Sequence, residues 1–206
     1  MRIRTLASHF AKYGQAEKEA YFGSGENPNT WIANMSPHPE RIEAGVERAL
    51  RAYFESAYAE YRDRHDRIGF KEVRYGRPEL ELLKACYPDA AIVLIVRHPV
   101  PAWKSAAPIW EHDADAFART WNERAVAYAE LADPGRGIHL IRYEDLIGRD
   151  EATLALLADL AGIGRRDIDS VLNVPLNSTR AERDGQELER IRRLCREGMN
   201  RLGYAE

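Results

Sequence analysis

The sequence predicts an α/β fold in which a parallel sheet is flanked by helices, and three observations lead to this prediction. Residues 90–96 form an unbroken apolar run rich in β-branched side chains, which is typical of a central strand covered on both faces. Further strands are expected over 68–73 and 138–143, and helical patterns separate all three strands. Arg97 and Tyr143 follow two of these strands, at the carboxyl ends where ligands bind to such sheets.

Helices are expected wherever apolar residues recur at helical spacing between turn signals. Asp113 or Asp115 is expected to cap one of these helices, and Pro108 to interrupt another. Asp150 begins a helix that Gly162 closes. The expected helices are 2–22, 36–57, 78–87, the segment around Ser105, 113–131, 150–161, 168–172 and 186–202.

Composition indicates a soluble globular protein, and residues 1–206 are expected to form a single domain. The 206 residues are 45% apolar and 31% charged, which is enough for a real core. A net charge of −3 argues against binding to nucleic acid. The absence of a long apolar run predicts no membrane contact and a cytoplasmic location. Cys86 and Cys195 are expected to be buried free thiols, and no His/Cys/Asp cluster indicates a metal.

The segment after residue 96 has the features of an anion site. Arg97 ends the apolar run, and Pro99 and Pro101 favour a turn into a helix. A guanidinium there can donate two parallel hydrogen bonds to phosphate oxygens. Free backbone N–H groups at the start of the helix are expected to donate further hydrogen bonds to the same anion. Ser105 lies about two helical turns further on and can contact the same anion. The alternative is that Arg97 and Ser105 are both ordinary solvent-facing residues.

Three stretches resemble motifs of the sulfotransferase family, whose donor is 3′-phosphoadenosine 5′-phosphosulfate. The order of Arg97 and Ser105 after an apolar strand resembles the 3′-phosphate motif. Gly-Phe-Lys-Glu-Val-Arg-Tyr at 69–75 resembles the active-site strand, and Ile138 to Leu146, which contains Tyr-Glu-Asp-Leu, resembles the late strand. The resemblance covers roughly residues 66–163, and it implies a P-loop-NTPase-like sheet.

The resemblance also implies roles for two residues near the first expected strand. Lys71 matches the lysine that lines the sulfuryl site, where it neutralises charge on the bridging oxygen. Many members carry a histidine two residues later as the general base, but Val73 stands there. A base must therefore come from elsewhere or be absent. Glu72 is the nearest carboxylate and is the candidate base, although strand alternation points it away from Lys71. The structural alternative for Lys71 is an ion pair with Glu72 or Glu79, or a position on an edge strand.

The donor nucleotide has four candidate contacts. Arg97 and Ser105 would hold the 3′-phosphate, and Tyr143 would border the adenine with its aromatic face. Tyr143 could instead be an ordinary core aromatic. Arg180 lies in a late polar loop and matches, weakly, the basic C-terminal loop that closes the 3′-phosphate site in the family.

One family element is missing from the sequence, namely the N-terminal strand–loop–helix with a loop of the Arg-Ser-Gly-Thr-Thr type. That loop wraps the 5′-phosphosulfate with backbone N–H groups, as P-loops wrap nucleotide phosphates. Two interpretations follow: the chain is an N-terminally incomplete sulfotransferase, or it is a degenerate member that only binds nucleotide. The lost strand would also leave an open sheet edge, through which a second copy or a partner chain is expected to associate.

The sequence therefore predicts a sulfotransferase-family domain that moves a sulfuryl group from the donor to a hydroxyl or amine acceptor. No metal is required for this reaction. With the phosphosulfate loop missing, negligible transfer is expected from the isolated chain. The alternative is a non-catalytic nucleotide-binding or interaction module derived from a sulfotransferase.

Overall fold

The computed structural model describes residues 39–110, 113–173 and 184–204, and the chain divides between Pro88 and Asp89 into two compact units. Each unit is described by itself below. The helix expected over 2–22 and the polar loop containing Arg180 lie outside the described residues. The prediction of a single domain over 1–206 stays a prediction.

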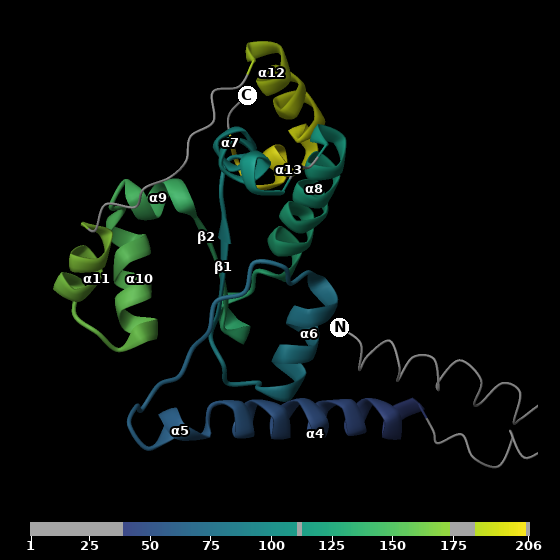
Figure 1. Ribbon diagram of the computed structural model, residues 1–206. Helices are drawn as coiled ribbons and strands as arrows, with labels where there is room; N and C mark the ends of the chain where they lie inside the picture. Colours follow the sequence, from purple (N-terminus) through teal and green to yellow (C-terminus); the bar gives the residue numbers. More distant parts are fainter. Residues whose placement is uncertain (1–38, 111–112, 174–183, 205–206) are drawn as a thin grey trace, which may run out of the picture. The chain divides into compact units, whose positions relative to one another are not determined.

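The described part of the first unit is helical, and its small core lies between α4 and α6 (Figure 1). Val46 of α4 packs with Leu82 and Cys86 of α6, and Leu50 and Tyr87 cover this cluster. The helix expected to begin near Pro78 is confirmed as α6. The helices of this unit are α4 (Pro39–Ala57), α5 (Ala59–Arg62) and α6 (Arg77–Cys86).

The strand expected over 68–73 is wrong, because this segment is irregular. The backbone N–H groups of Val73 and Arg74 donate to the Glu72 carboxylate at 2.8 and 3.0 Å, which closes a local turn instead of a strand ladder. Phe70 stacks on Phe54 of α4, with ring centroids 5.3 Å apart. The apolar side chain of Phe70 therefore packs against an aromatic side chain of α4 and not against a sheet face.

The second unit contains a two-stranded parallel sheet, formed by β1 (Ile92–Val96) and β2 (Ile138–Arg142) side by side (Figure 1). The strands predicted at these positions are confirmed. Burial of β1 differs from the prediction, because Leu94 is 3% exposed while Ile95 is 49% exposed. The described residues therefore cover only one face of this strand. They also add no strand to the edge of β1 opposite β2, so association through that edge stays a prediction.

Helices surround these strands, and the main core lies between α7, α8, α12 and α13. Trp103 of α7 and Ile191 of α12 are almost fully buried there. The interruption expected at Pro108 is wrong, because α7 continues through it. Asp113 caps α8 as expected. The remaining elements are α7 (Pro99–Trp110), α8 (Ala114–Leu131), η1 (Pro134–Arg136), α9 (Tyr143–Ile147), α10 (Glu151–Ala161), α11 (Arg165–Leu172), α12 (Gly185–Leu194) and α13 (Arg196–Arg201).

Cys86 and Cys195 are buried free thiols, as predicted. Across residues 39–110, 113–173 and 184–204, no helix combines the length and apolar character needed to cross a bilayer. The same residues contain no group of three or more His, Cys, Asp or Glu side chains arranged for a metal ion.

Candidate functional site

The candidate site lies at the carboxyl ends of β1 and β2. Val96 pairs with Arg142 at the end of the ladder, so the residues that follow, Arg97 and Tyr143, lie next to each other. The Arg97 guanidinium carbon is 4.7 Å from the centroid of the Tyr143 ring, within the range of a cation–π contact. The two residues therefore meet as expected from the order of the strands, while their roles stay predictions.

Arg97 has the properties of an anion-binding side chain. It is half-buried, and no carboxylate forms an ion pair with it among the described residues. Its backbone carbonyl accepts a hydrogen bond from the Trp121 indole N–H at 3.1 Å. Tyr143 supports one face of the guanidinium and takes up none of its N–H donors. The arginine is thus held in place while its donors stay available for a phosphate.

The start of α7 corrects one expectation, because its first turn offers no free backbone N–H group. Pro99 and Pro101 have none. The N–H of Val100 donates to His98 Nδ1 at 3.3 Å, and the N–H of Ala102 donates to the His98 carbonyl at 3.1 Å. An anion at this place must therefore be held by side chains, chiefly the Arg97 guanidinium, with only the field of the helix to assist.

Glu144 connects the two strand ends and was not singled out from the sequence. Its Oε1 accepts a hydrogen bond from the His98 N–H at 2.9 Å, and its Oε2 accepts one from the Tyr204 hydroxyl at 2.9 Å. The rings of His98 and Tyr204 meet edge to face, with centroids 5.3 Å apart. Nearby, Arg142 forms a bidentate pair with Asp145 at 2.8 and 3.0 Å.

Burial changes the proton affinities of two residues in this cluster. It raises the pKa of the Tyr204 hydroxyl, and the hydrogen bond to Glu144 acts in the same direction. It also lowers the pKa of His98, which favours the neutral imidazole. A neutral imidazole with Nδ1 as acceptor carries its proton on Nε2. The sequence motif Tyr-Glu-Asp-Leu contained the signal for Glu144, but nothing in the sequence indicated Tyr204.

Ser105 lies in the same unit, half-buried on α7. It is six residues past Pro99, which is about 9 Å along the helix axis. No hydrogen bond connects it to Arg97 among the described contacts. Joint contact of both side chains with one phosphate stays a prediction.

Lys71 and Glu72 belong to the first unit. Lys71 is exposed on the irregular segment. Glu72 is held by Arg74, whose Nε and Nη2 donate to its two oxygens at 2.8 and 2.7 Å. This side-chain pairing, with the backbone N–H groups of Val73 and Arg74, lowers the pKa of Glu72 to about 2. A carboxylate with such a pKa is a weak base, so the ion pair opposes the catalytic role expected for Glu72.

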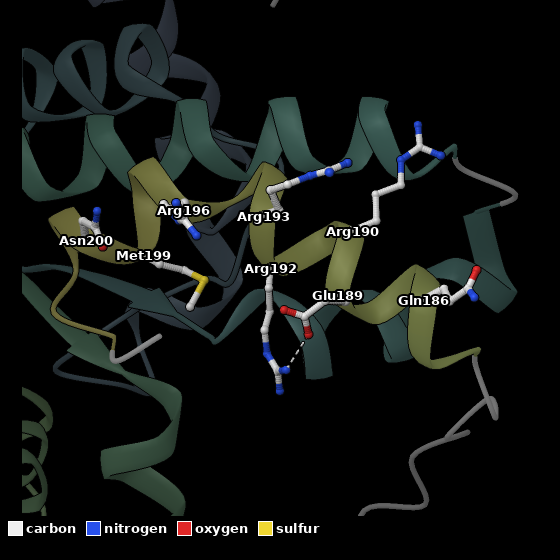
Figure 2. Close-up of a pocket in the computed structure, with 8 residues that line it drawn as sticks. All are labelled: Gln186, Glu189, Arg190, Arg192, Arg193, Arg196, Met199 and Asn200. Atoms are coloured by element: carbon white, nitrogen blue, oxygen red, sulfur yellow. Dashed lines mark hydrogen bonds and ion pairs between the residues drawn. The ribbon is translucent and has the colours of Figure 1, made fainter.

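A hollow of about 480 Å³ lies on the surface of α12 and α13, and none of the predicted site residues is among those that line it (Figure 2). Arginines dominate it, but Arg192 pairs with Glu189 at 2.9 Å and Arg190 pairs with Asp115. Exposed pairs of this kind are typical of a solvated helix face. The lining residues are Gln186, Glu189, Arg190, Arg192, Arg193, Arg196, Met199 and Asn200.

Comparison with known proteins identifies the family. The sequence model of the sulfotransferase family matches residues 3–167, which extends the match well beyond the 66–163 stretch that carries the three motifs. Searches of curated proteins and of solved structures gave no match. Since the family match spans most of the 206 residues, this chain belongs to the sulfotransferase family.

Proposed function

We propose that this chain is a domain for moving a sulfuryl group from 3′-phosphoadenosine 5′-phosphosulfate to a hydroxyl or amine of an acceptor, with release of adenosine 3′,5′-bisphosphate, and that the isolated chain, which lacks the phosphosulfate loop, transfers little by itself. Family membership supports sulfuryl transfer in general. The observation that carries the choice of donor is Arg97, a half-buried guanidinium stacked on Tyr143 at the carboxyl ends of two parallel strands. A 3′-phosphate is the anion that the family motif places at this position.

The proposed nucleotide contacts combine this geometry with the family resemblance. The N–H donors of Arg97 form a bidentate pair with the 3′-phosphate, and the Ser105 hydroxyl adds a second contact. Tyr143 borders the adenine with the ring face that Arg97 leaves uncovered. The family resemblance adds Arg180, which lies outside the described residues, as the candidate to close the phosphate site. Because the first turn of α7 supplies no N–H groups, most of the affinity for the 3′-phosphate rests on Arg97.

In the transfer step, the acceptor oxygen or nitrogen forms a bond to sulfur while the bond between sulfur and the bridging phosphate oxygen breaks. The nucleotide leaves with the electron pair of that bond, and the acceptor loses its proton to a base. Lys71 neutralises the negative charge on the leaving oxygen. Glu72 accepts the proton only in a state in which Arg74 has released the Glu72 carboxylate, because the ion pair holds the pKa of Glu72 at about 2.

The engagement of Glu72 by Arg74 favours a second candidate function, a non-catalytic module that keeps the nucleotide site. In this module Arg97 still binds the 3′-phosphate, but no residue takes the acceptor proton. The two functions share the binding step and differ only in turnover.

The binding step is tested with adenosine 3′,5′-bisphosphate. The ligand should raise the melting temperature of the protein, since it binds only the folded state. In calorimetry, Arg97→Ala should weaken binding by about 2–3 kcal/mol, or about 30- to 150-fold, because it removes a charge-assisted pair. The matched control is Arg136→Ala, which removes an exposed arginine from η1. Equal affinity of wild type and Arg97→Ala would overturn the assignment.

Turnover separates the two functions. The wild-type protein is incubated with sulfur-labelled donor and a panel of simple alcohols, phenols and amines. Labelled product supports transfer, whereas nucleotide binding without product supports the non-catalytic module.

A further inference from the structure

The peptide unit between Arg97 and His98 is fixed from both sides. Its carbonyl, which belongs to Arg97, accepts a hydrogen bond from Trp121 at 3.1 Å. Its N–H, which belongs to His98, donates to Glu144 at 2.9 Å. Because a peptide unit is planar, the two bonds together fix its rotation and hence the direction in which the Arg97 side chain leaves the backbone.

We propose that Glu144 and Tyr204 are positioning residues, which hold this peptide and so orient the Arg97 guanidinium for the nucleotide's 3′-phosphate. The proposal rests on the proposed function of Arg97. Glu144 acts on the peptide directly, and Tyr204 acts through Glu144.

Both carboxylate oxygens of Glu144 are engaged by neutral donors. Oε1 takes the His98 N–H and Oε2 takes the Tyr204 hydroxyl, each at 2.9 Å. None of the ion pairs formed by the described residues involves Glu144. The preceding residue, Tyr143, stacks on Arg97, so two consecutive residues after β2 contact two consecutive residues after β1. Orientation of the Arg97 segment thus depends on this pair of contacts.

The charge of Glu144 argues for a geometric role. A carboxylate close to a phosphate site weakens anion binding by repulsion. Glu144 cannot support binding through its charge, because a negative carboxylate repels a negative phosphate. A glutamine has the same shape, accepts from the His98 N–H through its carbonyl, and can donate to the Tyr204 oxygen. The neutral amide should therefore keep the position of Arg97 and remove the repulsion.

Tyr204 contributes in two separable ways. Its ring packs edge to face against His98, with centroids 5.3 Å apart at an interplanar angle of 82°. Its hydroxyl holds the second oxygen of Glu144. Tyr204→Phe keeps the ring and removes only the hydrogen bond, so it isolates the effect on Glu144.

The test measures the affinity for adenosine 3′,5′-bisphosphate by calorimetry on the full chain. We expect Glu144→Ala to weaken binding about tenfold and Tyr204→Phe about threefold, from the loss of one hydrogen bond that fixes the site. Glu144→Gln should bind as tightly as wild type or more tightly. The matched control is Glu151→Ala, which removes an exposed carboxylate of α10 and should leave the affinity unchanged.

Each outcome decides the proposal. Wild-type affinity in Glu144→Ala overturns the proposal. So does an equal loss of affinity in Glu144→Ala and Glu144→Gln. A lowered melting temperature of Glu144→Ala with unchanged affinity of the folded protein also overturns it. If Glu144→Ala does not fold, wild-type affinity in Tyr204→Phe or weak binding in Glu144→Gln overturns it instead. Arg97→Ala is measured in parallel. If that variant also binds normally the proposed function fails, whereas weak binding there with normal binding in Glu144→Ala refutes only the positioning role.

Discussion

The segments around Arg97 and Lys71, which belong to separate units, are held by contacts of very different range. The Arg97–His98 peptide is bound by Trp121 and Glu144, which lie 24 and 46 positions away in the sequence. The turn after Lys71 is closed by hydrogen bonds between residues one or two positions apart. Phe70 adds a longer contact to Phe54, but its ring remains 46% exposed.

This difference separates a rigid segment, which bears Arg97, from an adaptable segment, which bears Lys71. Long-range hydrogen bonds exist only when the whole unit is folded, so the position of Arg97 is as stable as the core around it. Local bonds can open without disturbing that core. The segment that bears Arg97 is therefore expected to be rigid before any ligand binds, whereas the segment that bears Lys71 can change its conformation at small cost.

Hydrogen exchange gives the largest expected contrast between the two segments. The His98 amide should open only with much of the second unit, whereas the Val73 and Arg74 amides open by local fluctuation. Their protection factors should differ by about 1,000-fold or more. Mass spectrometry or NMR of the protein in deuterated buffer measures both. Comparable protection in the two segments would refute the distinction.

Core truncation should affect the two segments unequally. Trp103 is 2% exposed and contacts Phe117 with ring centroids 5.0 Å apart, so Trp103→Ala should lower the free energy of unfolding by about 3–5 kcal/mol. Phe70→Ala removes a half-exposed stack and should cost about 0.5–1.5 kcal/mol. Urea denaturation of both variants provides the comparison. A larger loss for Phe70→Ala than for Trp103→Ala would reverse the assignment of rigidity.

Donor and product affinities test which end of the nucleotide Lys71 meets. Lys71→Ala should weaken binding of 3′-phosphoadenosine 5′-phosphosulfate by about 1.5–3 kcal/mol, because it removes a charged donor from the sulfuryl group. Binding of adenosine 3′,5′-bisphosphate, which lacks that group, should not change. Arg64→Ala, an exposed basic residue of the same unit, is the control. If Lys71→Ala weakened the binding of both ligands equally, the lysine would contact a phosphate instead of the sulfuryl group.

The ion pair of Glu72 with Arg74 predicts the smallest effect, a pH dependence of stability. The folded-state pKa of Glu72 is lowered from 4.5 to about 2, so the pair stabilises the fold fully above pH 4.5 and loses this contribution as the pH falls towards 2. The stability difference between wild type and Glu72→Gln should shrink over that interval. An NMR titration that finds the Glu72 carboxyl group near its ordinary pKa would show that the pair does not form.

Sequence patterns were sufficient for the parts of the fold that depend on local order. The apolar runs ending at Val96 and before Tyr143 predicted two strands, and their parallel pairing brought Arg97 to Tyr143. The strand expected around Phe70 failed, since alternation alone does not show whether apolar side chains face a sheet layer or an aromatic neighbour such as Phe54.

Other features depend on contacts that no local pattern contains. The free N–H groups expected at α7 are absent because His98 caps the helix with both its ring and its carbonyl. The bond between Glu144 and Tyr204 joins residues 60 positions apart. Such a pair becomes visible only when the chain is folded, which is why sequence analysis selected Tyr143 and passed over its neighbour.

The prolines at the start of α7 have a consequence for ligand discrimination. A loop of amide groups grips any phosphate or sulfate of suitable size, whatever nucleotide carries it. Here side chains must distinguish a nucleotide with a ribose phosphate from one without it, and Arg97 is the chief candidate for this role. Preference over ATP and other nucleotides that lack this group should accordingly depend mainly on Arg97, and exchanging this arginine for an uncharged residue should strongly reduce the preference while leaving the sheet and its helices intact.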